Sequence, residues 1–154
     1  MYMYAVFVFC AVVAADTGDD KDQSNEFVGF SVTMKEITSV TPGQMVKYNN
    51  VITNVGNHYD PDTGVFTAPR TGYYMFHIHA ITNGPAAFWF QLVHNGIARV
   101  NCHGFNAWAM GGNSVLLHVM AGESVYVRAV HLTGNVYDHA TEHYTTFCGV
   151  MVGQ

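Results

Sequence analysis

The sequence predicts an all-β domain, either a sandwich or a barrel of short strands. No window of the chain holds apolar residues at a sustained 3.6-residue period, and short β-branched and aromatic runs alternate with Gly, Asn and Pro. Apolar residues make up 49% of the chain and aromatic residues 14%, which excludes a disordered polypeptide. Only 11% of the residues are charged, so much of the surface is expected to face other copies of the protein rather than water.

The strands are delimited by turn-forming residues. The pattern predicts strands over 27–34, 46–54, 64–68, 72–82, 86–95, 97–103, 113–120, 124–131 and 145–152. Asn95-Gly96 predicts a type I′ hairpin, because both central residues of that turn need positive φ. Asn83-Gly84-Pro85 and Gly111-Gly112-Asn113 are interpreted as breaks between strands, and 133–144 as a polar loop.

The first 26 residues differ from the rest of the chain. Residues 1–15 are apolar, too short to span a bilayer and end in small residues, as a signal peptide does, so we expect a secreted, extracellular protein without a membrane span. Residues 16–26 form an acidic, flexible leader, and 27–154 form one domain. The net charge of −5 offers no basic face for a phosphate backbone, so nucleic-acid binding is excluded.

One series of residues has the spacing of a known signature. Counting from Tyr48, the series continues with Asn54, Tyr59, Phe66, Gly72, Tyr74, Phe76 and Ile78. In this order and spacing the chain resembles the C1q domain family over about 125 residues, with Tyr48 standing where Phe is usual and Ile78 where Phe or Tyr is usual. Tyr74, Phe76 and Ile78 alternate along one strand and are therefore expected in the core.

The resemblance implies a ten-stranded jelly-roll β-sandwich, similar to that of the tumour-necrosis-factor ligands, assembled as a homotrimer. It implies that Met75, His77 and His79, which alternate with the core positions, face the other subunits. It also implies that Cys102 and Cys148 lie on different sheets, so that we expect free thiols. Short, stalkless relatives are regarded as innate-immune recognition proteins, which implies binding of glycans or microbial surface patterns.

The loops farthest from the chain termini are the expected ligand-binding region. Alternating connections place 38–45, 82–86, 104–113 and 133–144 at that end. Their aromatic and polar side chains suit sugar faces and hydroxyls, and the candidates are Phe105, Asn106, Trp108, Tyr137, Asp138, His139, Glu142 and His143. The alternative hypothesis is a ligand of a protein receptor or matrix partner, because fold does not fix function.

Residues 139–143 match the zinc-protease pattern H-x-x-E-H. That motif needs a helix, and here it precedes a strand, so we interpret it as a polar loop and expect no enzyme and no required cofactor. Asp138, His139, Glu142 and His143 remain weak candidates for a metal, with calcium the cation that oxygen ligands suit.

Overall fold

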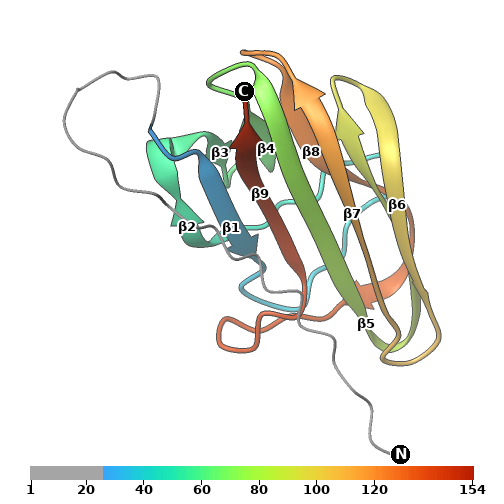
Figure 1. The fold of residues 1–154 in the computed structure, drawn as a ribbon. Coiled ribbons are helices and arrows are strands. Elements are labelled where there is room, and N and C mark those ends of the chain that lie inside the picture. Colours follow the sequence, from blue (N-terminus) through green and yellow to red (C-terminus); the bar gives the residue numbers. More distant parts are fainter. Residues whose placement is uncertain (1–25) are drawn as a thin grey trace, which may run out of the picture.

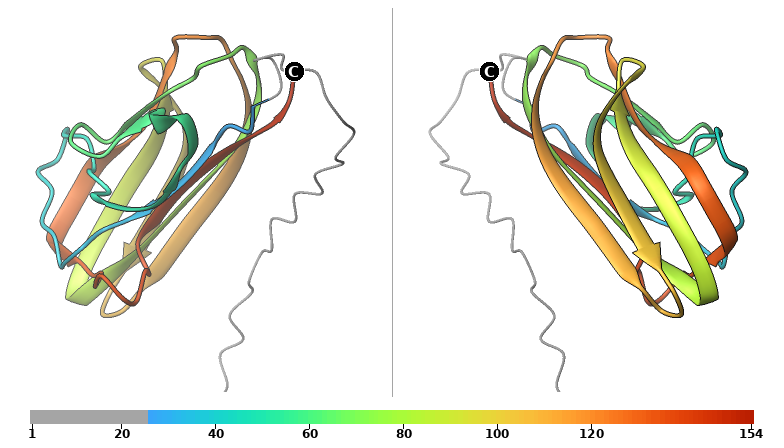
Figure 2. Two further views of the ribbon diagram at one scale, coloured as in Figure 1. Left: turned by 90° about the vertical axis from the view of Figure 1, so that its left-hand side faces the viewer. Right: turned by 90° about the vertical axis from the view of Figure 1, so that its right-hand side faces the viewer.

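The computed structural model describes residues 26–154, and the signal peptide expected over 1–15 and nearly all of the acidic leader lie outside the described residues. The chain forms two antiparallel sheets packed face to face (Figure 1). Both views of Figure 2 show the two layers side by side. This is the jelly-roll sandwich that the resemblance implied.

The first sheet contains five strand segments. Its order is β2 (Asn50–Asn54), β1 (Gly29–Thr33), β9 (Thr146–Gly153), the first half of β5 (Gly72–His94) and β7 (Met110–Val119). The order of the second sheet is β3 (Tyr59–Asp60), β4 (Val65–Thr67), β8 (Ser124–Val136), the second half of β5 and β6 (Ile97–Phe105). A 3₁₀ turn, η2 (Val55–Asn57), joins β2 to β3.

Strand β5 belongs to both sheets. Residues 72–81 pair with β7 and β9, and residues 87–94 pair with β6 and β8. The two separate strands expected over 72–82 and 86–95 are therefore one element, which bends where a register shift occurs between Asn83 and Ala87 and where Gly84 adopts a φ of 70°. Counting both halves of β5, the nine labelled strands supply the ten segments that were expected.

The core lies between the two sheets and is rich in aromatic rings. Tyr74, Phe76 and Ile78 are fully buried, as the alternation predicted. Phe30 stacks on Tyr59 and on Phe66, each at 5.0 Å between ring centroids.

Three strand boundaries differ clearly from the expectation, and the first is that the strand expected over 46–54 begins only at Asn50. The strand expected over 113–120 begins at Met110, because Gly111 and Gly112 pair with Ala80 and His79 instead of forming a turn. A Cβ atom on Gly111 would lie 2.2 Å from the His103 carbonyl oxygen, so this glycine permits a close approach between strands. The strand expected over 124–131 continues to Val136, which shortens the loop expected over 133–144 to 137–145.

The connections sort to two ends as expected, with one exception. Asn95 and Gly96 both have positive φ, and the Asn95 N–H donates to Ser124 at the end that holds the C-terminus. At the opposite end, Thr82 contacts the loop between β6 and β7, while the Tyr137 N–H donates to Ile81. The exception is the segment 38–46, of which 38–45 were expected among the loops at the end farthest from the termini. It runs instead along the edge of β8, from the bridge between Thr38 and Val136 to the hydrogen bond between Val46 and Val127.

Candidate functional site

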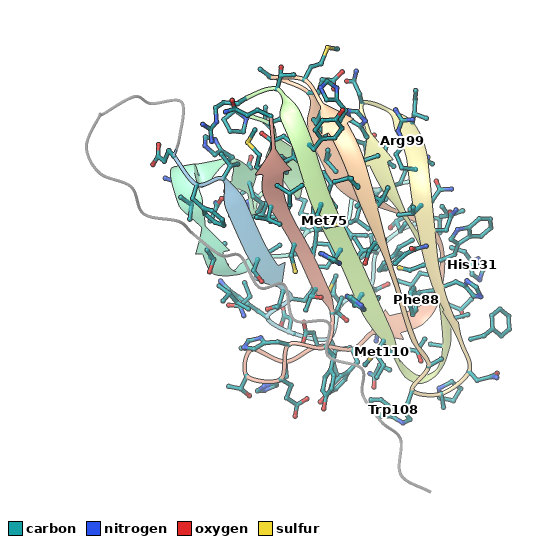
Figure 3. All side chains as sticks on the ribbon, in the orientation of Figure 1. Met75, Phe88, Arg99, Trp108, Met110 and His131 are labelled. Carbon is teal, nitrogen blue, oxygen red and sulfur yellow. The ribbon has the colours of Figure 1, made fainter. Side chains whose placement is uncertain are left out.

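Three aromatic side chains gather at the loop end. The rings of Trp108 and Tyr137 meet edge to face at 5.2 Å between centroids, and Tyr137 lies 6.0 Å from Tyr144. Trp108 is 56% exposed and Tyr144 is 43% exposed, so both present ring surface to solvent. We call Trp108, Tyr137 and Tyr144 the aromatic cluster; Trp108 lies at the lower end of the molecule in Figure 3.

Hydrogen bonds between the Thr82 side chain and the backbone on both sides of Trp108 hold this residue in its exposed position. The Thr82 hydroxyl donates to the carbonyl of Asn106 at 2.7 Å and accepts from the N–H of Ala109 at 2.9 Å. Asn106 and Trp108 both adopt positive φ, of 78° and 57°. Such a backbone costs a bulky residue about 1–3 kcal/mol. The Thr82 contacts therefore fix a tight turn that displays the indole.

Asp138 has a structural position beneath this cluster. Its carboxylate is buried, with a residue exposure of 1%, and it accepts four backbone N–H groups, from Met34, His139, Tyr144 and Thr145. These bonds tie the loop 137–145 to the end of β1. Its two oxygens point inward, so Asp138 orients the aromatic cluster and does not belong to the surface that a ligand would meet.

The other polar candidates have separate contacts. Glu142 accepts a 2.5 Å hydrogen bond from the Tyr137 hydroxyl, which raises the pKa of Tyr137. His139 contacts the hydroxyl of Thr141, and His143 contacts that of Thr33 at 3.2 Å.

The structure does not gather the weak metal candidates. Within residues 26–154, no three His, Cys, Asp or Glu side chains lie close enough together to hold a metal ion. The backbone amides around Asp138 take up its oxygens, and Asp138, His139, Glu142 and His143 do not converge. The helix that a zinc-protease motif needs is also absent over 139–143, where the described chain forms turns.

Phe105 and Asn106 precede Trp108 in the turn after β6 and border a shallow pocket of about 310 Å³. The pocket lies between the turn after β6, the bend of β5 and β8, and it is lined by Pro85, Ala86, Ala87, Phe105, Asn106, Ala107, His131 and Thr133. The predicted set therefore divides into two members of the aromatic cluster, the pocket wall, the buried Asp138 and the three polar side chains of His139, Glu142 and His143, which have separate contacts. Sequence reasoning missed Tyr144 as a candidate, although it is the last residue of the loop 133–144 that was singled out.

The expected interface residues lie on the outer face of the first sheet. Met75 and His77 are half-buried, and His79 is exposed, in the isolated chain. The His77 Nδ1 lies 2.7 Å from the Ser114 hydroxyl of β7. Partial desolvation of the imidazole rings by the surrounding side chains lowers the pKa of His77 and of His79, although much of the His79 side chain is still exposed, and His77 lowers the pKa of His79 further. Met75 lies at the centre of the face turned toward the viewer in Figure 3.

Cys102 and Cys148 do not form a disulfide with each other. Cys102, on β6, is buried in the core, and burial raises the pKa of its thiol to about 12. Cys148, on β9, faces away from the core, where the Ser31 hydroxyl lies 3.9 Å from its sulfur. The expectation that the two residues lie on different sheets is confirmed.

Comparisons with known sequences agree over most of the domain. The family model of the C1q domain matches residues 29–152. A complement C1q subcomponent of Mus musculus is 28% identical over 107 residues, 70% of this chain and 44% of that protein. A complement C1q subcomponent of Bos taurus is 28% identical over 120 residues, 74% of this chain and 48% of that protein. The chain thus spans less than half the length of these curated relatives.

Solved structures share the fold. The globular domain of zebrafish complement 1qA protein aligns with a TM-score of 0.67 at 20% identity, covering 82% of this chain and 98% of that one. Murine APRIL at pH 5.0 aligns with a TM-score of 0.64 at 11% identity, covering 82% of this chain and all of the other.

Among the described residues, no helix is long and apolar enough to cross a membrane.

Proposed function

Because this chain belongs to the C1q domain family, we propose that it is a secreted, non-enzymatic recognition protein that binds glycans of microbial surfaces through the loop end of a homotrimer. The observation that carries the proposal is the aromatic cluster at that end. Pyranose rings present C–H faces that pack on aromatic rings, and loops on a rigid scaffold are the usual place for binding residues.

The site has both apolar and polar components. Trp108 and Tyr144 supply exposed ring surface, while Glu142 and His139 supply exposed hydrogen-bonding groups around them. Asp138 and Thr82 hold the two contributing loops by backbone contacts, so the rings are positioned before a ligand arrives. Preorganised side chains lose less conformational entropy on binding, which favours affinity for a small saccharide.

The trimer is supported by the outer face of the first sheet. None of the strands β1, β2, β7 and β9 or residues 72–81 contains Lys, Arg, Asp or Glu. Exposed apolar side chains lie on this face instead, with Tyr73 46%, Leu116 51% and Val152 53% exposed. A large uncharged apolar face is typical of an interface between protein chains. Three heads would also increase the avidity of weak sites, since the second contact is effectively intramolecular.

A glycan array tests the binding. Mature protein is applied to bacterial and fungal polysaccharides with and without a chelator, and we expect saturable binding that free sugar competes. Trp108→Ala and Tyr144→Ala should each weaken that binding by about tenfold, and Ile97→Ala, an exposed apolar residue at the opposite end, should leave it unchanged. If the array shows no binding and the protein instead captures a cell-surface receptor, the proposal is contradicted. That result would favour the alternative function, a ligand of a protein receptor, which is compatible with the fold shared with APRIL.

Light scattering at micromolar concentration tests the assembly, and we expect three times the chain mass. Leu116→Lys places a charge in the proposed interface and should yield monomers. Ile97→Lys adds the same charge to an equally exposed position on β6 and should leave the trimer intact. A monomeric wild-type protein would contradict the proposed trimer.

Secretion is tested by sequencing the amino terminus of the exported protein, which is expected near Asp16.

A further inference from the structure

The outer face of the second sheet carries a polar and aromatic surface away from the aromatic cluster. Trp89, at the centre of β5's second half, is 44% exposed. Its direct partners in the neighbouring strands are His103 of β6 and His131 of β8. The next row along these strands holds Asn101, Gln91 and Arg128. We call these six residues the second-sheet face; the right-hand view of Figure 2 looks toward these strands.

The indole of Trp89 is held in one orientation. Its ring N–H donates to the Asn101 side-chain oxygen of β6 at 2.8 Å, which fixes the orientation of the ring. The core-facing neighbours Phe88 and Phe90 are buried beneath it. An exposed aromatic ring with a fixed orientation presents a flat apolar surface to a ligand at little entropic cost.

The charged side chains on these strands of the second sheet are all positive. No Asp or Glu occurs in β6, in β8 or in residues 87–94 of β5, whereas Arg99 and Arg128 do. This contrasts with the net charge of −5 of the whole chain. Arg128 donates to the Gln91 side-chain oxygen at 2.9 Å, which orients the guanidinium on the surface and uses one of its five N–H donors.

Trp89 and Arg128 lie on adjacent strands, one row apart. Arg128 lies directly opposite Gln91, two residues along β5 from Trp89, with a register shift between Trp89 and Phe90. Both side chains are on the outer face of the sheet, and both are long enough to approach one another across such a spacing. A sugar ring stacked on the indole would therefore place a ring substituent within reach of the guanidinium. His103 and His131 are the strand partners of Trp89 on its two sides, and both are exposed, so their imidazoles are available to hydrogen-bond a ligand.

We propose that the second-sheet face binds a carboxylated pyranose, the repeating unit of a polyuronate. The ring packs on Trp89, its carboxylate pairs with Arg128, and its hydroxyls bond to His103 and His131. The pocket of about 310 Å³ begins at Ala87 and His131, beside Trp89, and receives the next sugar of the chain. The inference rests on the recognition function proposed above but places this ligand on different residues.

A neutral sugar would use the indole and leave Arg128 without a counterpart. A charge-assisted bond to a carboxylate is roughly twice as strong as a neutral hydrogen bond, so the guanidinium selects the acidic sugar. The probes are accordingly alginate oligomers as the polyuronate, dextran oligomers as the neutral glycan and polyglutamate as a polyanion without sugar rings.

Calorimetric titration of the mature protein with these probes tests the inference. We expect saturable binding of alginate oligomers and at least tenfold weaker binding of dextran and polyglutamate. Trp89→Ala and Arg128→Gln should each weaken alginate binding by roughly tenfold or more. The controls are Ile97→Ala, an exposed apolar residue at the start of β6, and Arg99→Gln on the same strand, and both should stay within about twofold of wild type.

A direct readout accompanies the variants, because the chain contains only two tryptophans. In nitrogen-labelled protein, alginate should shift the indole N–H signal of Trp89, assigned by its loss in Trp89→Ala, and leave that of Trp108 in place. The titration itself uses wild-type protein, and where Trp89→Ala folds poorly the loss of the other indole signal in Trp108→Ala gives the same assignment.

The outcomes separate this inference from the proposed function. Alginate binding that Trp108→Ala abolishes and Trp89→Ala leaves intact would overturn the inference while supporting the loop end. Equal affinity for polyglutamate, or no alginate binding, would also overturn it. Alginate binding through Trp89, with every glycan indifferent to Trp108→Ala, would support the inference and contradict the loop-end site.

Discussion

The hydroxyl of Tyr48 is the one buried side-chain oxygen or nitrogen in residues 26–154 that has no hydrogen-bond partner. Tyr48 is fully buried, its ring centroid lies 5.7 Å from that of Phe147, and burial raises its pKa well above the ordinary value, so the hydroxyl stays protonated. An unsatisfied buried polar group costs about 1–3 kcal/mol. The position is one where related sequences usually have Phe, which has no such group.

Tyr48→Phe should therefore stabilise the domain. Removing the hydroxyl recovers part of the burial cost and loses only the packing of one oxygen, for a net gain of about 1 kcal/mol. In a domain of this size that gain corresponds to a rise in melting temperature of roughly 3–5 °C. The measurement is denaturant unfolding and calorimetry at one fixed protein concentration, because assembly makes the midpoint depend on concentration.

Tyr59→Phe is the matched control, because it removes the same atom from a satisfied hydroxyl. The Tyr59 hydroxyl donates to the carbonyl of Tyr48 and accepts from its N–H, each at 3.2 Å. Its loss leaves two buried backbone groups unpaired and should destabilise the domain by about 1–3 kcal/mol. Opposite signs for the two variants are expected. A Tyr48→Phe protein less stable than wild type by more than about 0.5 kcal/mol would refute the reasoning, since the hydroxyl would then have a favourable partner.

Three further results are expected. The lowered pKa values of His77 and His79 mean that the folded chain binds fewer protons than the unfolded chain, so their contribution to the stability of the fold is complete above about pH 6.5 and declines below it. Burial of both imidazoles in the proposed trimer interface would desolvate them further, which gives assembly the same pH dependence. Sedimentation velocity should show trimers loosening in acid, and a His77→Gln, His79→Gln variant should lose that response; Ser114 and Cys148 face His77 from the neighbouring strands. Asp138→Asn should lower stability by about 2 kcal/mol or more in urea titrations, because an amide cannot accept all four N–H groups; unchanged stability would count against the burial argument. Cys102 should react with a thiol reagent only at the rate of unfolding, since its thiol is buried with a pKa of about 12; rapid labelling of folded protein would be inconsistent with that burial.

Local patterns predicted those parts of the fold that depend on neighbours in sequence. The alternation of Tyr74, Phe76 and Ile78 identified a core face, and Asn95-Gly96 identified its hairpin, because both follow from backbone geometry within a few residues. Gly111 was misinterpreted because a glycine next to glycine suggests a turn. Its actual role is set by the His103 backbone on the adjoining strand, a contact that short-range patterns do not encode.

The candidate site was predicted to a similar extent. The aromatic residues of the two distal loops do meet, as alternating connections implied. The burial of Asp138 could not be foreseen, because its donors include the Met34 N–H, more than 100 residues away in sequence. Trp89 was within reach of sequence reasoning, since it alternates with the core residues Phe88 and Phe90, but a search restricted to loops passed over it.

The double membership of β5 has a consequence for how the domain opens. Because one continuous strand supplies hydrogen-bonded neighbours to β6, β7, β8 and β9, neither sheet can detach without disrupting the other. Amide hydrogens of both halves of β5 should exchange with solvent in a single global event, with a common free energy of opening. The bend at Gly84, where the register slips, is where a local opening would begin, and it lies beside the loops that carry the aromatic cluster. We expect fluctuations near the loops of the aromatic cluster to start at the bend, while the sandwich behind them remains one cooperative unit.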